Sequence, residues 1–211
     1  MTSLPGLPLY LEFALCMGLG RLISEHVAAR QGNQGWTDEQ MIMALVLLNL
    51  VGGECVDDLR VLEGDEGLCR VLREMELYGR TRSEKRALKR RWRKERVRAF
   101  PSPTAMREYL ELFHDPEQEQ YRKPHEAFIP EPSPLLGALV QLVGAFAAAV
   151  QRRSPVKTAT LDMDATMVET YKKAALYCYK KFKAYQPLNI YWAEQELIPN
   201  TPTTACRNGI L

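Results

Sequence analysis

Residues 158–164 read Thr-Ala-Thr-Leu-Asp-Met-Asp, so polar and apolar side chains alternate without interruption. Alternation with a period of two, together with the β-branched threonines, predicts a strand with one polar and one apolar face. Asp162 and Asp164 then project from the same face, about 7 Å apart along the strand. A second strand is predicted over residues 188–194, with an intervening one at 176–179.

Two interpretations of this acidic strand face stay open. Carboxylate oxygens are the ligands that Mg²⁺ prefers, and paired ions in phosphoryl transfer activate the attacking oxygen and stabilise the leaving one. A strand can also carry acids on its wet face simply for solubility, although aspartate is depleted in strands. Glu169 and Glu194 are further carboxylates nearby in the sequence, and we interpret them as surface groups or ion-pair partners.

The chain before this strand is patterned as helices. Thr37 and Gln40 have the spacing of a capping box, which predicts a helix that begins at Asp38 and ends at the glycines 52 and 53. A single helix is predicted over residues 12–30. Five prolines within residues 114–134 predict a linker. The apolar run 135–150 is shorter than the roughly 20 residues of a membrane span, so it predicts a buried helix and no membrane role.

The net charge of +2 conceals a strongly basic segment. Residues 79–98 contain eleven Lys or Arg residues and two Glu, which gives +9, while the rest of the chain carries −7. Such a segment favours nucleic acid, because cations neutralise phosphates without regard to sequence. The eleven cations would populate nearly all sides of a helix. The alternative is a solvated surface helix, although such helices normally interleave Glu with Lys. The candidate DNA-binding residues here are Arg82, Lys85, Arg86, Lys89, Arg90, Arg91, Arg93, Lys94 and Arg96.

A second basic segment follows the acidic strand. Between residues 171 and 185, five lysines are interleaved with tyrosines and a phenylalanine, and no acid is present. Basic groups with interleaved aromatic rings suit nucleic-acid backbones and exposed bases, but aromatic residues at strand spacing also form ordinary cores. The candidate DNA-binding residues in this segment are Lys172, Lys173, Lys180, Lys181 and Lys183.

The cysteines and histidines argue against several other classes. Five cysteines without a CxxC pair, and three histidines with no cysteine or histidine four residues away, make structural zinc and disulfide frameworks poor interpretations. Free thiols in a reducing cytosol fit better. The N-terminus lacks the pattern of a signal peptide, so a cytoplasmic location is expected.

Several short motifs, taken in order, resemble a known family. Over about residues 5–198 the chain is similar to the bacterial DDE transposases of the insertion-sequence family thirteen-eighty. The motifs that carry this resemblance are Thr-Ala-Thr-Leu-Asp-Met-Asp-Ala-Thr-Met-Val-Glu-Thr from residue 158, Ala-Leu-Tyr-Cys-Tyr-Lys from 175, Ala-Tyr-Gln-Pro-Leu from 184, Trp-Ala-Glu-Gln from 192, Gly-Gly-Glu-Cys-Val-Asp-Asp-Leu from 52, Arg-Arg-Trp-Arg-Lys-Glu-Arg from 90 and Phe-His-Asp-Pro from 113.

The resemblance implies an enzyme that cuts and joins double-stranded DNA at the terminal repeats of its element. Such enzymes use three acidic residues and two Mg²⁺ ions on an RNase H-like fold, in the bacterial cytoplasm and in association with the nucleoid. The first acid lies in an Asp-x-Thr context, which Asp164 provides with Thr166. Asp162 is a weaker metal candidate on the same face. The other two family acids are expected beyond the point where this sequence stops.

The expected architecture is therefore α+β: a mainly α-helical N-terminal region followed by the first strands of an incomplete RNase H-like domain. Residues 1–113 are predicted to bind DNA or to dimerise, so a homodimer is a further expected assembly. Residues 114–134 form the linker, 135–198 begin the catalytic domain, and the tail 199–211 is unlike the family. We expect a truncated, inactive transposase; the alternatives are a DNA-binding module that represses an intact transposase, and a relic without function.

Overall fold

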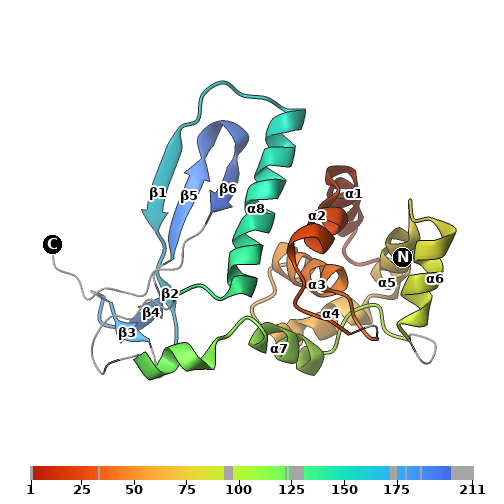
Figure 1. Ribbon diagram of the computed structural model, residues 1–211, viewed down its shortest axis with the longest axis horizontal. Coiled ribbons are helices and arrows are strands. Elements are labelled where there is room, and N and C mark those ends of the chain that lie inside the picture. The colour runs from red at the N-terminus through yellow and green to blue at the C-terminus, as the bar shows by residue number, and fades with distance from the viewer. Residues whose placement is uncertain are drawn as a thin grey trace. The chain divides into compact units, whose positions relative to one another are not determined.

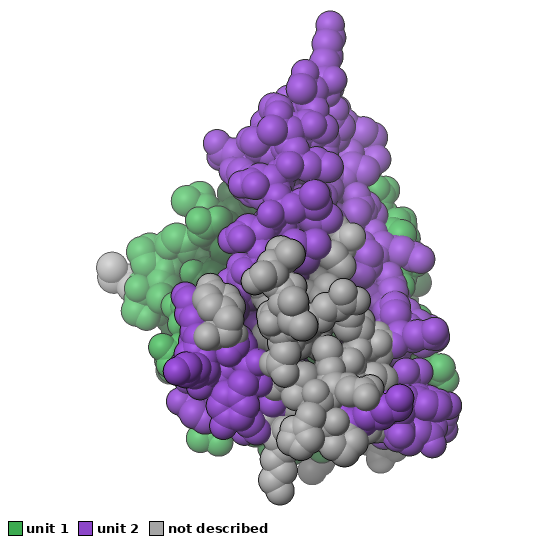
Figure 2. Space-filling model, turned by 90° about the vertical axis from the view of Figure 1, so that its left-hand side faces the viewer, with its two compact units in different colours: residues 1–113 green, residues 114–211 purple. Residues whose placement is uncertain are grey.

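The computed structural model describes residues 2–32, 34–92, 97–121, 123, 131–171, 175–178, 180–185 and 187–200. The chain divides into two compact units, residues 1–113 and 114–211, which Figure 2 shows in green and purple. Described residues of the first unit form helices, and the second combines a long helix with small antiparallel sheets (Figure 1). The fold is therefore α+β, as the sequence predicts.

The first unit is built from short helices that pack around one core. The helices are α1 (Leu7–Met17), α2 (Leu19–His26), α3 (Asp38–Leu50), the 3₁₀ helix η1 (Val56–Asp58), α4 (Leu59–Gly64), α5 (Glu66–Leu77), α6 (Arg82–Arg90) and α7 (Pro103–Glu111). The largest fully buried side chains include Tyr109, Phe100, Ile23, Met41 and Met106. They come from α2, α3, α7 and the segment before α7, so residues far apart in the sequence share this core.

The structure confirms one helix boundary that the sequence predicts in this unit and corrects another. The capping box is confirmed: the Thr37 N–H donates to the Gln40 side chain at 3.0 Å, and the Gln40 N–H donates to the Thr37 hydroxyl at 3.2 Å. The single helix expected over residues 12–30 is instead two helices, α1 and α2, bent by 59°. Gly18 stands at the bend with a φ of +71°, a left-handed conformation that glycine adopts without the clash of a Cβ.

The described residues of the second unit form one long α-helix, two 3₁₀ helices and two small sheets. Its elements are the 3₁₀ helix η2 (Pro116–Tyr121), α8 (Pro134–Arg153), β1 (Leu161–Ala165), β2 (Val168–Glu169), β3 (Leu176–Tyr177), β4 (Lys183–Tyr185), β5 (Leu188–Trp192), the 3₁₀ helix η3 (Ala193–Gln195) and β6 (Leu197–Asn200). One sheet has the order β1-β5-β6 and the other the order β2-β4-β3, with every pairing antiparallel. The predicted strands appear as β1, β3 and β5, whereas β2, β4 and β6 have no counterpart in the sequence prediction.

Helix α8 is more exposed than its composition predicts. Only Leu142, Ala147 and Ala149 are buried, while Val140 is 47% exposed. The reason is geometric, since α8 lies along β6 of a sheet only three strands wide (Figure 1), and that sheet covers a single side of the helix. By length and composition α8 could cross a membrane, and so could the bent pair α1 and α2, although core helices satisfy the same criterion.

Candidate nucleic-acid interface and acidic strand

Strand β1 carries the acidic pair on one face of its sheet. Asp162 lies opposite Tyr191 of β5, and Asp164 lies opposite Asn189. Residues two apart on a strand share a face, so the two carboxylates project on the same side, and both are exposed. The order β1-β5-β6 puts β1 at the edge of its sheet, which leaves the carboxylates accessible from the side as well as from the face.

The start of β1 is fixed by a carboxylate from a distant part of the sequence. Glu194 accepts a hydrogen bond from the Thr160 N–H at 2.8 Å and another from the Thr160 hydroxyl at 2.6 Å. These hydrogen bonds hold the pKa of Glu194 below its ordinary value, because they stabilise the ionised carboxylate. Glu194 is thus committed to the position of the strand rather than to a metal.

The end of β1 is fixed by the threonine of the Asp-x-Thr motif. The Thr166 N–H donates to the Pro187 carbonyl at 3.1 Å, and the Asn189 amide donates to the Thr166 hydroxyl at 2.8 Å. Asn189 is also the register partner of Asp164. Thr166 therefore holds β1 against β5 at the level of Asp164.

Asp162 and Asp164 have no third His, Cys, Asp or Glu ligand beside them among the described residues. Within the part of the chain that the structure describes, no group of three or more His, Cys, Asp or Glu side chains is arranged to hold a metal ion. Carboxylate oxygens suit Mg²⁺, so Asp162 and Asp164 fit as ligands in type, but two of them do not enclose an octahedral ion.

The cations of the basic helix α6 lie on one side of the helix. At about 100° per residue, its five cations fall within about 140° of the circumference rather than on nearly all sides. None of the nine residues of α6 is buried. The opposite side carries Leu88, which is half-buried, and Glu84, which is exposed. The Glu84 carboxylate accepts hydrogen bonds from the N–H and hydroxyl of Thr81 in a capping box. The cations of this face are Arg82, Lys85, Arg86, Lys89 and Arg90.

Two arginines of the basic segment, Arg80 and Arg91, are instead bound to distant parts of the first unit, and a third, Arg98, makes a local hydrogen bond. Arg80 forms an ion pair with Glu39 of α3 and donates to the Glu76 carbonyl at 2.7 Å. Arg91 donates to the carbonyls of Gly35 and Trp36, at 3.1 and 3.4 Å. Arg98 donates to the Phe100 carbonyl at 3.2 Å. Arg91 was predicted to bind DNA, and its guanidinium is engaged in the fold.

Trp92 also packs against the body. Its ring meets that of Trp36 edge to face, with centroids 4.9 Å apart and planes at 82°. Edge-to-face pairs are a preferred arrangement of aromatic rings. Together with Arg91, this contact holds the C-terminal end of α6.

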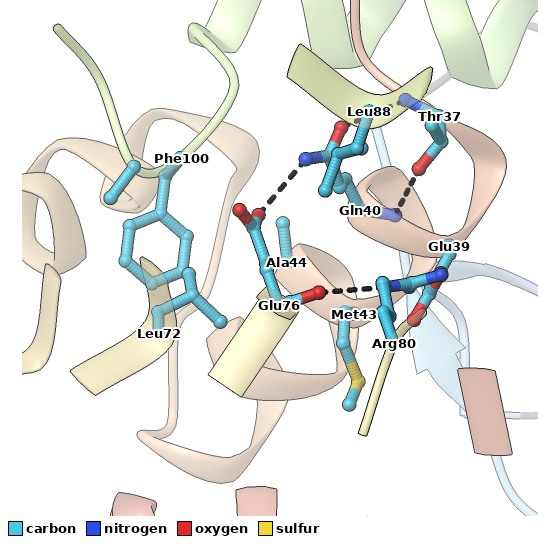
Figure 3. A pocket seen from close by; sticks show the side chains of 11 residues that line it. Thr37, Glu39, Gln40, Met43, Ala44, Leu72, Glu76, Arg80, Leu88 and Phe100 are labelled. Atoms are coloured by element: carbon cyan, nitrogen blue, oxygen red, sulfur yellow. Dashed lines mark hydrogen bonds and ion pairs between the residues drawn. The ribbon is translucent and has the colours of Figure 1, made fainter. Parts of the chain in front are cut away.

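The inner side of α6 closes a small cavity (Figure 3). Leu88 lines it together with Met43, Ala44, Leu72 and Phe100, and the cavity holds about 40 Å³. The Gln40 amide donates to the Glu76 carboxylate at 2.9 Å beside it. Ligand pockets are usually about 300 Å³ or larger, so this space is a packing defect beneath α6 rather than a substrate site.

The remaining predicted DNA-binding lysines lie in the second unit. Lys180 and Lys181 are exposed, and the Lys183 ammonium lies 5.9 Å from the centre of the Tyr177 ring. Five predicted residues fall outside the described residues: Arg93, Lys94, Arg96, Lys172 and Lys173.

Sequence reasoning missed the Thr160–Glu194 contact and the anchoring arginines. The hydrogen-bonded residues are 34 positions apart in the first case, and Arg80 and Glu39 are 41 apart, so no local signal reports them. The Thr81 capping box has a local signal, a threonine three residues before a glutamate at the head of a cationic helix. Comparison with known proteins gives no match to a family model, a curated protein or a solved structure.

Proposed function

We propose that this protein binds double-stranded DNA through the cationic face of α6 and takes part in DNA transposition of the DDE type. The single observation that carries the proposal is the gathering of five exposed or half-buried cations on one side of a nine-residue helix. The family resemblance of the sequence supplies the reaction class. Asp164, with Asp162 beside it, would supply metal ligands.

The cations of α6 are unfavourable to one another in the absence of an anion. Arg82 and Arg86, Lys85 and Lys89, and Arg86 and Arg90 are each four residues apart, so they are neighbours on the helix surface. A like-charge pair at this spacing costs about 0.2–0.5 kcal/mol. A row of phosphates relieves this repulsion and releases counterions, which makes the expected binding strongly dependent on salt.

The antiparallel order β1-β5-β6, with the acidic strand first in the chain, supports an RNase H-like interpretation of this sheet. On that interpretation Asp164 and Asp162 would hold Mg²⁺, which activates an attacking oxygen and stabilises the leaving one in phosphoryl transfer. Thr166 and Asn189 orient the strand at Asp164 by their hydrogen bond. The two carboxylates do not make a complete metal site, so we expect no strand cleavage from them alone.

A non-catalytic DNA-binding module is the second candidate. It is favoured by the position of the α6 cations in the first unit, whereas the acidic pair belongs to the second. Binding would then need no metal, and the protein could occupy the ends of an element and repress an intact transposase.

The test is a titration of a labelled blunt duplex with the protein, in which binding is measured by fluorescence anisotropy at a series of salt concentrations. Five phosphate contacts predict that the logarithm of the binding constant falls with the logarithm of salt with a slope of about −4.5. Binding that persists in EDTA favours the non-catalytic module. A flat salt dependence contradicts both candidates, and cleavage that Asp164→Ala abolishes would show that the chain is catalytic by itself.

A further inference from the structure

The sheet β2-β4-β3 lies directly beyond the acidic end of β1. Only Thr166 and Met167 separate β1 from β2, and Figure 1 shows the small sheet below the tip of the β1 arrow. Asp164 is the second-last residue of β1. A ligand that approaches Asp164 from the C-terminal end of β1 therefore passes this sheet. We call the described residues of its three strands and their connections, 168–171, 175–178 and 180–185, the tyrosine ribbon.

The tyrosine ribbon keeps some aromatic rings inside and others outside. Its own core is small, with Cys178 and Ala184 buried and Met167 and Phe182 packed against them. By contrast, Tyr171 is 91% exposed and Tyr177 is 60% exposed. Both rings are open to solvent, and an exposed ring is a surface on which the face of an unpaired base can stack.

A lysine lies against the exposed ring of Tyr177, and Thr170, the neighbour of Tyr171, donates its N–H to the Lys183 carbonyl at 2.9 Å. The Lys183 ammonium lies over one face of the Tyr177 ring, at 5.9 Å, and Lys180 and Lys181 are exposed in the turn between β3 and β4. Among the described residues of the ribbon, the acidic side chain is that of Glu169 in β2. The described charges are therefore three positive and one negative, which is complementary to an anion.

The turn that presents the lysines is held in an unfavourable conformation. The Lys181 N–H donates to the Cys178 carbonyl at 3.0 Å, and the Cys178 N–H donates to the Phe182 carbonyl at 2.8 Å. Lys181 has a φ of +66°, in the left-handed region that glycine or asparagine normally fills. A lysine at this position costs stability where glycine would not, and such costs are concentrated at functional sites.

We propose that the tyrosine ribbon binds unpaired nucleotides of a DNA end beside Asp164. Base faces are hidden inside a duplex, whereas an unpaired base can stack on the Tyr171 ring while its phosphates meet Lys180 and Lys181. The inference rests on the proposed function, because it requires DNA as the ligand. It adds that the second unit recognises the single-stranded part of the end, while α6 binds the duplex.

The experiment compares two labelled probes, a blunt duplex and the same duplex with a single-stranded 3′ overhang, using the full chain. The wild type is expected to prefer the overhang. Tyr171→Ala is expected to weaken overhang binding about tenfold and to leave blunt-duplex binding unchanged, because stacking on one aromatic ring is lost. Tyr171→Phe keeps the ring and is expected to bind as the wild type. Tyr10→Ala, which removes an exposed ring of α1, is the matched control.

Three results would overturn the inference. One is an equal affinity of the wild type for both probes, and another is an overhang preference that Tyr171→Ala leaves intact. The third is Tyr171-dependent binding to anionic lipid vesicles with no effect on the overhang, which would assign the ribbon to a membrane surface. Failure of the proposed function is distinguishable, because it would appear as salt-independent binding of the blunt duplex, which does not involve Tyr171.

Discussion

Glu194 holds Thr160 by two hydrogen bonds, one from the backbone N–H at 2.8 Å and one from the hydroxyl at 2.6 Å. In the opposite direction, the Ala193 N–H donates a hydrogen bond to the Thr160 carbonyl at 3.0 Å. These contacts close the β1–β5 pairing at the end opposite Asp164, next to the Leu161–Trp192 pair. The position of the acidic pair in the sheet therefore depends on a carboxylate whose two oxygens both accept hydrogen bonds from Thr160.

Replacement of this carboxylate is expected to loosen β1. Glu194→Ala removes both acceptors and should speed amide hydrogen exchange at Asp162 and Asp164, whose N–H groups face β5 in the antiparallel register, whereas Glu194→Gln retains one acceptor and should have a smaller effect. Glu169→Ala, which removes an exposed carboxylate of β2, is the control. Equal protection in Glu194→Ala and the wild type would contradict the assigned role of Glu194.

Asp65 should make the first unit sensitive to acid. Its carboxylate accepts hydrogen bonds from the Leu68 N–H at 2.9 Å, from the Ser3 N–H and hydroxyl, both at 2.7 Å, and from the Thr2 hydroxyl at 2.8 Å. The bonds from Leu68 and Ser3 do most to hold the pKa of Asp65 far below its ordinary value of 3.8.

The sign of this effect follows from the depressed pKa. Asp65 contributes stability that is fully present above its unfolded pKa and is lost as the pH falls through the lower folded value. Denaturant unfolding from neutral to acidic pH should show this loss for the wild type and a flatter profile for Asp65→Asn, which starts from a lower stability at neutral pH. Parallel profiles for the two proteins would contradict the prediction.

The cationic face of α6 should set the salt dependence of DNA binding. Replacing Arg82, Arg86 and Lys89 by alanine removes three phosphate contacts and should reduce the magnitude of the salt slope by about 2.7. Arg70→Ala serves as the control, since Arg70 is an exposed cation of α5 that pairs with Glu66. An unchanged slope in the triple variant would place the DNA contact elsewhere.

Arg80 should affect folding rather than DNA binding. Its side chain is 30% exposed, and it bonds the Glu39 carboxylate and the Glu76 carbonyl, which ties the segment before α6 to α3 and α5. Arg80→Ala is expected to lower the free energy of unfolding by about 1–3 kcal/mol, because hydrogen bonds of a charged group are lost. The slope of the logarithm of the DNA-binding constant against the logarithm of salt should stay near that of the wild type, whereas Arg86→Ala should reduce its magnitude.

The strained turn of the tyrosine ribbon gives opposite predictions for stability and binding. Lys181→Gly should stabilise the second unit by about 1 kcal/mol, because glycine adopts the left-handed conformation without steric cost. Lys181→Ala keeps that cost and should give no such gain. Both variants should weaken binding of the overhang probe, since each removes a cation. A lower melting temperature for Lys181→Gly would contradict the assigned strain.

Local chemistry in the sequence determined where several elements begin and which way their side chains point. The capping box at Thr37 and Gln40 fixes the start of α3, because both of its hydrogen bonds join residues three apart. Alternation alone places Asp162 and Asp164 on one face, because a strand repeats every two residues. These features need no knowledge of the rest of the chain.

Only the tertiary structure separated the basic residues into the exposed face of α6 and the arginines that anchor the fold. The charge run looks uniform in the sequence, yet Arg80 is held by Glu39, 41 residues away. Thr160 and Glu194 meet across 34 residues in the same way, and α8 stays exposed because a sheet of three strands covers only one side of it. Such outcomes depend on contacts between distant segments, and the pattern within any one segment carries no information about them.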